Sequence, residues 1–436
     1  MKNSITLSGR DHEAIWHPFT QHGLGRPLLP ITGAGGALLR DETGREYLDM
    51  ISSWWVNLHG HGRPELAKAV SEQVLRLDHV QFAGATHEPA VRLAERLLGK
   101  AGLRGTARVF YSDNGSTAVE AALKIAHQHW VNRGAPRRLF ATLRGAYHGD
   151  TVGAMSVGRS SGFFDAFGGL LFGTVALPVP LVWNGFVNAE GERAALAEAA
   201  SLLEGEGNSL AGLIVEPLVQ GAGGMRFHSP RFLSALCGMF RERGIPVIFD
   251  EVMTGFGRTG SFFAFQQTGF VPDLICLSKG ITGGILPLAV TIASNDLFDS
   301  FLGDDFSRAL AHGHSYTANP VACAAALASL DLHEDTASLN QVARINRRMA
   351  GHLDLLSAHP KVEKPRLLGG IAAFDLAGAD PSYSAGAGRE MASALQHRGI
   401  LLRPIGNVLY LIPPYCITDD QIDSAFAAIG EALGSA

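Results

Sequence analysis

The sequence predicts an α/β protein, in which a large domain with a mostly parallel central sheet flanked by helices is joined to a smaller α+β domain. Between about residues 65 and 330, short apolar segments alternate with helical patterns at intervals of roughly 30 residues, the period of βαβ units. These segments are almost continuously apolar, as in strands that are covered on both faces. A chain of 436 residues is also too long for one ordinary hydrophobic core.

The individual elements follow from local patterns. A hairpin is expected over residues 36–51, with its turn in the segment 41–44. Strands of the large sheet are expected at residues 107–111, 139–143, 211–215, 245–249, 274–277 and 288–293, and helices at 116–130, 193–204 and 321–333. Asn319 and Pro320 suit the N-cap and the first position of the last of these helices. After residue 335 a long helix should precede strands near 371–376, 400–403 and 408–412.

Three parts of the chain are therefore expected. Residues 65–330 form the large domain, residues 331–436 form the small domain, and residues 1–64 pack with the small domain.

Composition excludes several classes of partner. The net charge is −5 and no basic stripe is present, which argues against nucleic acid and anionic membranes. The first 13 residues are polar and lack the apolar region of a signal peptide, and no apolar run reaches the roughly 18 residues of a membrane span. The four cysteines form no CxxC pair, so packed, reduced thiols in a cytoplasmic protein are expected.

Charged residues end three successive predicted strands: Glu216, Asp250 and Lys279. Each one alone is explained by a strand emerging into solvent. Three charged residues at the ends of successive strands indicate a ligand-binding site, because ligands of open α/β sheets bind beyond the carboxyl ends of the strands. An isolated buried charge costs several kcal/mol, about 3–5 when its partner is removed, so these groups need partners.

A carboxylate and an amine at one edge of a sheet suit pyridoxal 5′-phosphate (PLP). Lys279 can bind the aldehyde of this cofactor covalently and later act as a general base. Asp250 can keep the pyridine nitrogen protonated, so that the ring accepts electrons. Sites for NAD or ATP have no comparable need for this pair. The large domain is therefore predicted to bind PLP.

A phosphate requires backbone N–H groups. The segment Asp113-Asn-Gly115-Ser116 follows a predicted strand and opens a helix, where N–H groups and the helix dipole favour an anion. A simple N-cap turn explains the same residues equally well. A second polar loop, residues 312–320, also precedes a helix and offers an alternative cradle.

Two other motifs are weaker. Residues 255–260 match GxGxxG, but four residues separate them from the strand and no acid ends the next strand, so a dinucleotide site is not expected. The HxH pairs lack a cluster of further ligands, so no metal site is expected; they lie at residues 59/61, 127/129 and 312/314.

Substrate contacts are less specific in the sequence. Tyr147, in a loop beyond a strand, can stack on a cofactor ring or simply pack. The adjacent Trp54 and Trp55 suit either the wall of an apolar pocket or a subunit interface. Arg403 can pair with a substrate carboxylate, although most such arginines lie on the surface.

Over essentially its whole length the chain resembles the class III, fold-type I, PLP-dependent aminotransferases. The resemblance rests on the segment Ile248-Phe-Asp-Glu-Val-Met-Thr-Gly-Phe-Gly-Arg-Thr-Gly260 and on Leu277-Ser-Lys-Gly280. It implies that Lys279 binds the cofactor, Asp250 pairs with its ring nitrogen, and Tyr147 lies over the ring. It also implies that the phosphate is held by Gly115 and Ser116, with His314 and Ser315 from the neighbouring subunit of a homodimer. Substrate would contact Trp54, Gly313 and Arg403, with Arg403 taking a carboxylate.

Three segments resemble the members of this class that aminate 8-amino-7-oxononanoate to 7,8-diaminononanoate in biotin synthesis. They are residues 16–20, 52–55 and 216–225. Members that use S-adenosyl-L-methionine as amino donor usually have tyrosine at the position of Phe19, and some relatives use lysine. The resemblance thus implies adenosylmethionine as donor and leaves lysine as an alternative, as well as a class III transaminase of ω-amino acids or diamines. A non-catalytic cofactor-binding sensor is disfavoured, because the chain has no room for a DNA-binding domain.

Overall fold

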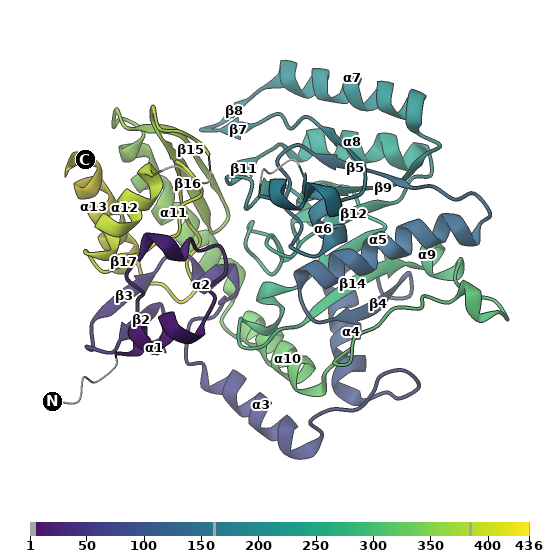
Figure 1. Cartoon of the computed structure of the whole chain (residues 1–436), viewed down its shortest axis with the longest axis horizontal. Helices are drawn as coiled ribbons and strands as arrows, with labels where there is room; N and C mark the ends of the chain where they lie inside the picture. Colours follow the sequence, from purple (N-terminus) through teal and green to yellow (C-terminus); the bar gives the residue numbers. More distant parts are fainter. Residues whose placement is uncertain (1–5, 160–162, 383–385, 436) are drawn as a thin grey trace.

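A seven-stranded sheet lies at the centre of the larger part of the structure (Figure 1). This computed structural model describes residues 6–159, 163–382 and 386–435. The strands run in the order β4-β14-β13-β12-β9-β5-β6, and their bounds are β4 Ala107–Ser112, β5 Leu139–Leu143, β6 Thr174–Leu177, β9 Leu210–Val215, β12 Val247–Asp250, β13 Leu274–Leu277 and β14 Ala289–Ser294. The six strands expected for this sheet are confirmed.

Two features of the sheet differ from a simple βαβ succession. β14 pairs antiparallel with both β13 and β4, because it returns from β13 through a short connection with no crossover helix. β6, the edge strand Thr174–Leu177, was missed; it has only four residues, of which the first three are partly exposed and Leu177 is buried. The remaining pairs are parallel, so the prediction of a mostly parallel sheet is confirmed.

Helices cover both faces of the sheet, which explains the continuously apolar strands. Ile248 of β12 packs in the same cluster as residues of α5 Gly115–Asn132. Its neighbours Val247 and Phe249 pack on the other face, with residues of α8 Pro230–Glu242. Other helices around this sheet are α3 Pro64–Arg76, α4 Glu88–Ala101, α6 Val152–Val157, α7 Ala189–Glu206, α9 Asn295–Asp299 and α10 Pro320–Asp335.

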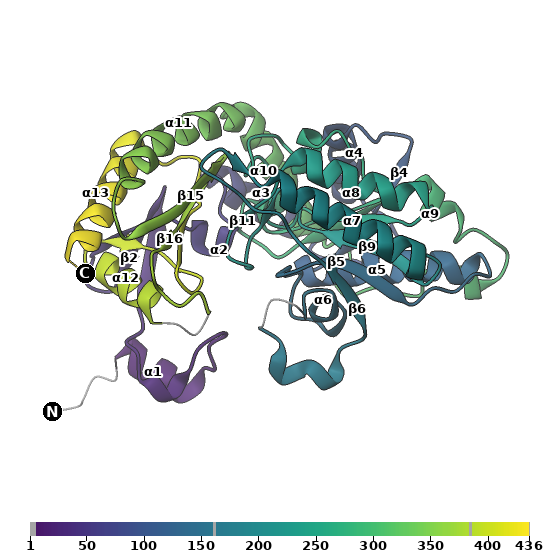
Figure 2. The ribbon, with the colours of Figure 1, turned by 90° about the horizontal axis from the view of Figure 1, so that it is seen from above.

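The N-terminal hairpin shares a sheet with the C-terminal part of the chain. The predicted hairpin is confirmed as β2 and β3, and β3 pairs in parallel with β17. The sheet consists of β1 Ile31–Gly35, β2 Leu38–Asp41, β3 Glu46–Asp49 and β17 Ile400–Leu401. Figures 1 and 2 both show these N-terminal elements beside the C-terminal ones.

A three-stranded antiparallel sheet completes the C-terminal part, and a small four-stranded sheet flanks the large one. The first contains β15 Val362–Leu368, β16 Ile371–Leu376 and β18 Val408–Leu411, beside α11 Ser338–Leu356, α12 Ala387–Gln396 and α13 Asp419–Ser435. The second contains β7 Val182–Trp183, β8 Phe186–Val187, β10 Val219–Gln220 and β11 Arg226–Phe227. Two short N-terminal helices are α1 Leu7–Ala14 and α2 Ser52–Trp55. The boundaries after residues 64 and 330 stay a prediction.

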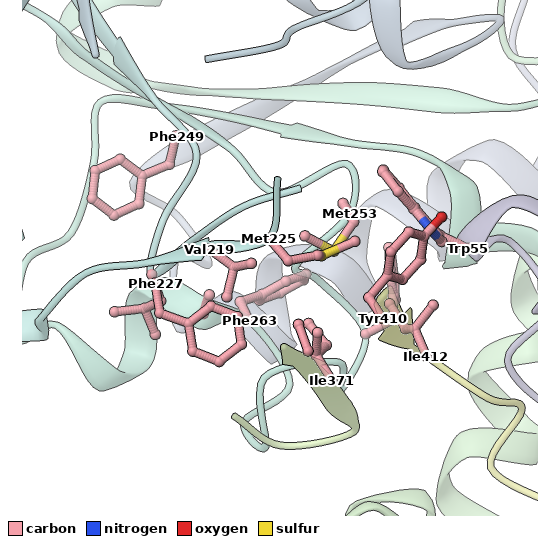
Figure 3. Packing of buried hydrophobic residues seen from close by; sticks show 14 of the residues in the cluster. Trp55, Val219, Met225, Phe227, Phe249, Met253, Phe263, Ile371, Tyr410 and Ile412 are labelled. Atoms are coloured by element: carbon pink, nitrogen blue, oxygen red, sulfur yellow. The ribbon is translucent and has the colours of Figure 1, made fainter. Parts of the chain in front are cut away.

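Apolar residues from these distant segments meet in one core. Figure 3 shows Trp55 of the N-terminal part beside Tyr410 and Ile412 of the C-terminal part and Met253 of the large domain. The indole Nε1 of Trp55 donates a hydrogen bond of 3.1 Å to the hydroxyl of Tyr410. Packed thiols were expected for all four cysteines. Cys237, Cys276 and Cys323 are buried, but Cys416 is exposed, so the expectation is wrong for that residue. Within the described ranges, no helix is long and apolar enough to cross a membrane.

Arg258 connects the same three segments through its buried guanidinium, which is 1% exposed. It donates to the carbonyl of Pro413 at 2.9 Å and to those of Trp55 and Asn57 at 3.4 and 3.3 Å. The GxGxxG match over residues 255–260 lies in a region of turns, with no α-helix directly after it.

We predict that Arg258→Ala lowers the free energy of unfolding by about 3 kcal/mol, because three buried carbonyl groups lose a charged donor. Urea denaturation of the apoprotein measures this change. The control is Arg92→Ala on the exposed face of α4, which should change stability by less than about 0.5 kcal/mol. A loss for Arg258→Ala no larger than that of the control would contradict the assigned role.

Candidate active site

The charged ends of three neighbouring strands line one cavity of about 690 Å³. β9, β12 and β13 are adjacent and parallel, so their carboxyl ends meet at the same edge of the sheet. The cavity is lined by Glu216, Asp250 and Lys279 from these ends, and by Gly115, Ser116 and Tyr147. The structure thus brings Glu216 together with five of the residues expected to hold the cofactor's ring, phosphate and aldehyde, while His314 and Ser315 lie outside this cavity.

Asp250 is fixed in place by two hydrogen bonds. Its Oδ1 accepts from the backbone N–H of Val252 at 3.0 Å, and its Oδ2 lies 2.8 Å from Nδ1 of His148. The aspartate is 5% exposed and His148 is 3% exposed. A carboxylate held this firmly at the floor of a cavity can pair with a cationic ring nitrogen.

Lys279 follows β13 in a left-handed backbone conformation, with φ of 44°. Its Nζ lies 5.1 Å from the centre of the Trp55 ring. Burial lowers the pKa of its amine, and the nearby carboxylates of Asp250, Glu216 and Asp150 oppose this effect. A lowered pKa favours the neutral amine, which is the form that attacks an aldehyde or accepts a proton.

Glu216 holds two backbone segments beside the cavity. Its Oε2 accepts from the N–H of Tyr147 at 3.1 Å, and its Oε1 accepts from the N–H of Gly221 at 2.9 Å. Burial raises the pKa of this carboxyl group to about 7, since the charge of His148 lowers it only in part.

The predicted phosphate cradle lies at the start of α5. Asn114 caps the helix by accepting from the N–H of Thr117 at 3.1 Å, and the first two helical residues, Gly115 and Ser116, line the cavity. A Cβ on Gly115 would lie 2.7 Å from Cγ1 of Val252, and one on Gly149 would lie 1.9 Å from Oγ of Ser116. The backbone therefore borders the cavity without side chains at two positions, as a close-fitting anion requires. These residues, with Asp250 and Lys279, fit PLP.

A second cavity of about 370 Å³ adjoins the first at Lys279 and Tyr147. Its wall contains Trp54 and Arg403, which were expected to contact substrate, together with Phe19 and Tyr147; Gly313, expected with them, does not line it. Phe19 and Trp54 are in edge contact, with ring centres 5.8 Å apart, and the Arg403 guanidinium lies 4.3 Å from the centre of the Trp54 ring. The two tryptophans have different places, because the α2 segment is kinked: Trp55 is buried and Trp54 is 38% exposed.

Tyr147 lies between the two cavities. Its hydroxyl donates to Oδ1 of Asp150 at 3.0 Å, and its ring stacks with that of Phe164. Burial and the carboxylates of Asp150, Asp250 and Glu216 raise the pKa of this phenol, so it stays protonated near neutrality.

The loop of residues 313–315 lines neither of these cavities. Nδ1 of His314 lies 3.5 Å from the carboxylate of Asp113, beside the cradle, and the carbonyl of Ser315 accepts from His79 at 2.7 Å. Gly313 is exposed. Their action on a neighbouring subunit's phosphate stays a prediction.

Three residues of the site were not predicted from the sequence. His148 supports Asp250, Asp150 orients the Tyr147 hydroxyl, and Phe163 faces Phe19 across the second cavity at a ring-centre distance of 6.2 Å. The position of His148 next to Tyr147 was a usable signal, while Asp150 and Phe163 carry no local motif. Among the described residues, no cluster of three or more His, Cys, Asp or Glu side chains can hold a metal.

Comparison with known proteins agrees with this geometry. The family Aminotransferase class-III matches residues 19–433. The chain belongs to the class III aminotransferases. Members of this class use PLP, so the predictions of the enzyme class, the fold type and the cofactor are confirmed.

Several relatives of this class III aminotransferase share one name. Adenosylmethionine-8-amino-7-oxononanoate aminotransferase of Synechococcus elongatus is 49% identical over 422 residues, covering 97% of this chain and 99% of the relative. The crystal structure of the enzyme of that name from Methanocaldococcus jannaschii is 35% identical, with a TM-score of 0.92 and 99% coverage of both chains. A PLP-bound amine transaminase from an uncultivated Pseudomonas species is 33% identical, with a TM-score of 0.90 and coverage of 97% and 98%.

Because Gly149 borders the phosphate cradle, we predict that Gly149→Ala weakens the binding of PLP. The added methyl group would meet the Ser116 hydroxyl in a backbone with φ of 125°, so we expect PLP affinity to fall at least about 10-fold. Titration of the apoprotein with PLP, followed by absorbance, gives the dissociation constant. Gly134→Ala is the matched control, since its φ of 72° is also left-handed but its Cβ meets no atom within 4 Å. Equal affinities of the two variants would contradict the cradle.

The raised pKa of Glu216 leads us to expect that stability depends on pH. A carboxyl group with a folded-state pKa of about 7, raised from 4.5, keeps its proton in the folded protein while the unfolded chain loses it. The contribution of Glu216 to the free energy of unfolding therefore declines as the pH rises from 4.5 to about 7, and it is constant below and above this window. Glu216→Gln should remove that decline. Burial raises the pKa of Glu251 to about 7 as well, but this group titrates in both proteins and so does not account for a difference between them. Urea midpoints of the two apoproteins across this pH window measure the difference; parallel curves would refute the raised pKa.

Proposed function

We propose that this class III aminotransferase converts 8-amino-7-oxononanoate to 7,8-diaminononanoate in biotin synthesis. The observation that carries the proposal is the second cavity, which has the amine of Lys279 and the guanidinium of Arg403 in its wall and is otherwise mostly apolar. Such a cavity suits an aliphatic chain that bears the reacting carbonyl at one point and a carboxylate at its end. The name shared by the relatives, adenosylmethionine-8-amino-7-oxononanoate aminotransferase, supports the same substrate.

The side chains have separable tasks in this reaction. When bound, PLP supplies an aldehyde that can carry the transferred amine and a ring that accepts electrons. Lys279 holds the cofactor and moves protons at its Nζ, for which its lowered pKa prepares it. Asp250 keeps a cationic ring nitrogen paired, and Arg403 orients the substrate carboxylate. Trp54 and Phe19 exclude water from the aliphatic chain.

S-adenosyl-L-methionine is the proposed amino donor. Lysine is a second candidate, because Phe19 offers no hydroxyl at this wall of the cavity, where members that use adenosylmethionine usually have tyrosine. Two phenols line the same cavity: the Tyr147 hydroxyl donates to Asp150, and the Tyr410 hydroxyl accepts from Trp55. A transaminase of ω-amino acids or diamines remains the alternative activity.

We also propose a homodimer in which each active site is completed by His314 and Ser315 of the other subunit. The exposed apolar side chains near this loop and on α3 support such an interface: Tyr316 is 64% exposed, Phe306 is 78% exposed and Leu75 is 87% exposed. We place the enzyme in the cytoplasm, where thiols such as that of Cys416 stay reduced.

The proposal is tested by incubating the PLP-loaded protein with 8-amino-7-oxononanoate and either adenosylmethionine or lysine, and quantifying 7,8-diaminononanoate. We expect turnover with one of the two donors, and a loss of at least about 10³-fold in Lys279→Ala, which lacks the covalent anchor and the proton carrier. The exposed Lys68→Ala is the control and should keep full activity. Absence of product with both donors would refute the substrate, while turnover of ω-amino acids instead would establish the alternative.

A further inference from the structure

The hairpin loop between β10 and β11 links the active site to the C-terminal sheet. Residues 221–225 form this loop, and Gly221 at its start donates its N–H to Glu216. The carbonyl of Gly221 accepts from the N–H groups of Gly224 and Met225 at 3.1 and 2.9 Å. The position of the Gly221 amide therefore depends on the conformation of the last two residues of the loop.

That conformation is strained and tightly enclosed. Met225 has φ of 47°, a left-handed value that costs a side-chain-bearing residue free energy. A Cβ on Gly223 would lie 2.1 Å from the carbonyl oxygen of Gly145, and one on Gly221 would lie 3.2 Å from the Trp55 ring. Such a loop needs external contacts to persist in one shape.

Arg366 of β15 supplies these contacts. Its Nε donates to the carbonyl of Met225 at 2.6 Å, and its Nη2 donates to that of Gly224 at 2.8 Å. Its Nη1 donates to Asp375 of β16 at 2.8 Å, which fixes the guanidinium and balances its charge. Arg366 is 8% exposed, and none of its atoms lines either cavity of the active site.

We propose that Arg366 is a positioning residue of the active site. By clamping the carbonyls of Gly224 and Met225, it holds the Gly221 amide on Glu216, and through Glu216 it holds the backbone of Tyr147. The inference deepens the proposed function, because it assigns a residue of the C-terminal sheet to the transamination site. Lysine cannot replace it fully, since one ammonium group cannot reproduce the planar fork that spans two carbonyls and a carboxylate.

The test compares Arg366→Ala and Arg366→Lys with a matched control, Arg344→Ala. Arg344 also donates to an aspartate, Asp419, and to a backbone carbonyl, that of Ile417, but it contributes to neither cavity. We expect Arg366→Ala to raise the PLP dissociation constant about 10-fold and lower kcat by 10- to 100-fold, with partial recovery in Arg366→Lys. Arg344→Ala should lose thermal stability but keep both values within about twofold.

A double-mutant cycle decides whether Arg366 acts through Glu216. If it does, adding Arg366→Ala to Glu216→Gln should change PLP affinity much less than adding it to the wild type. Full additivity, or a PLP dissociation constant of Arg366→Ala equal to that of Arg344→Ala, would overturn the proposal. If Arg366→Ala does not fold, the cycle with Arg366→Lys gives the same decision. PLP affinity does not depend on the amine transferred, so a failure of the proposed substrate is distinguishable from a failure of this inference.

Discussion

Burial of a carboxylate and an amine at the same edge of one sheet is the constraint on which this structure depends. Asp250 and Lys279 end adjacent parallel strands, and neither charge is tolerated there without partners. His148 and the Val252 amide hold the aspartate, while burial lowers the pKa of the lysine. An electron-poor pyridine aldehyde satisfies both groups at once, which is why the cavity between them suits PLP.

The site also depends on segments that are far apart in the sequence. Trp55 bonds to Tyr410, Arg258 joins the N-terminal segment to Pro413, and Arg366 joins β15 to the loop beside Glu216. These contacts explain why the N-terminal hairpin pairs with β17 in place of forming a separate unit. Phe19, Trp54 and Arg403, which line the second cavity, come from the same regions, so the shape of that cavity depends on the packing of both chain ends.

Much of this arrangement was predictable because its signals are local. Continuously apolar segments identified the central strands, and Asp250, Lys279 and Glu216 were recognisable as the charged residues at or just after the ends of three of them. The direction of β14 and the partly exposed edge strand β6 were not predictable, since both depend on connections and edges, not on composition. Phe163 and Arg366 were not predicted for a related reason: their partners are distant in sequence, and Arg366 lies 142 residues after Gly224. Asp150 is only three residues from Tyr147, but no local motif identifies the contact.

The central claim is that Lys279 is the residue that binds PLP covalently. Its most direct test is reduction of the PLP-loaded protein with borohydride, followed by proteolysis and mass spectrometry of the labelled peptide. The account predicts a single pyridoxyl label, on Lys279, in the peptide that follows β13. A label on another lysine, or no label after saturation with PLP, would contradict it.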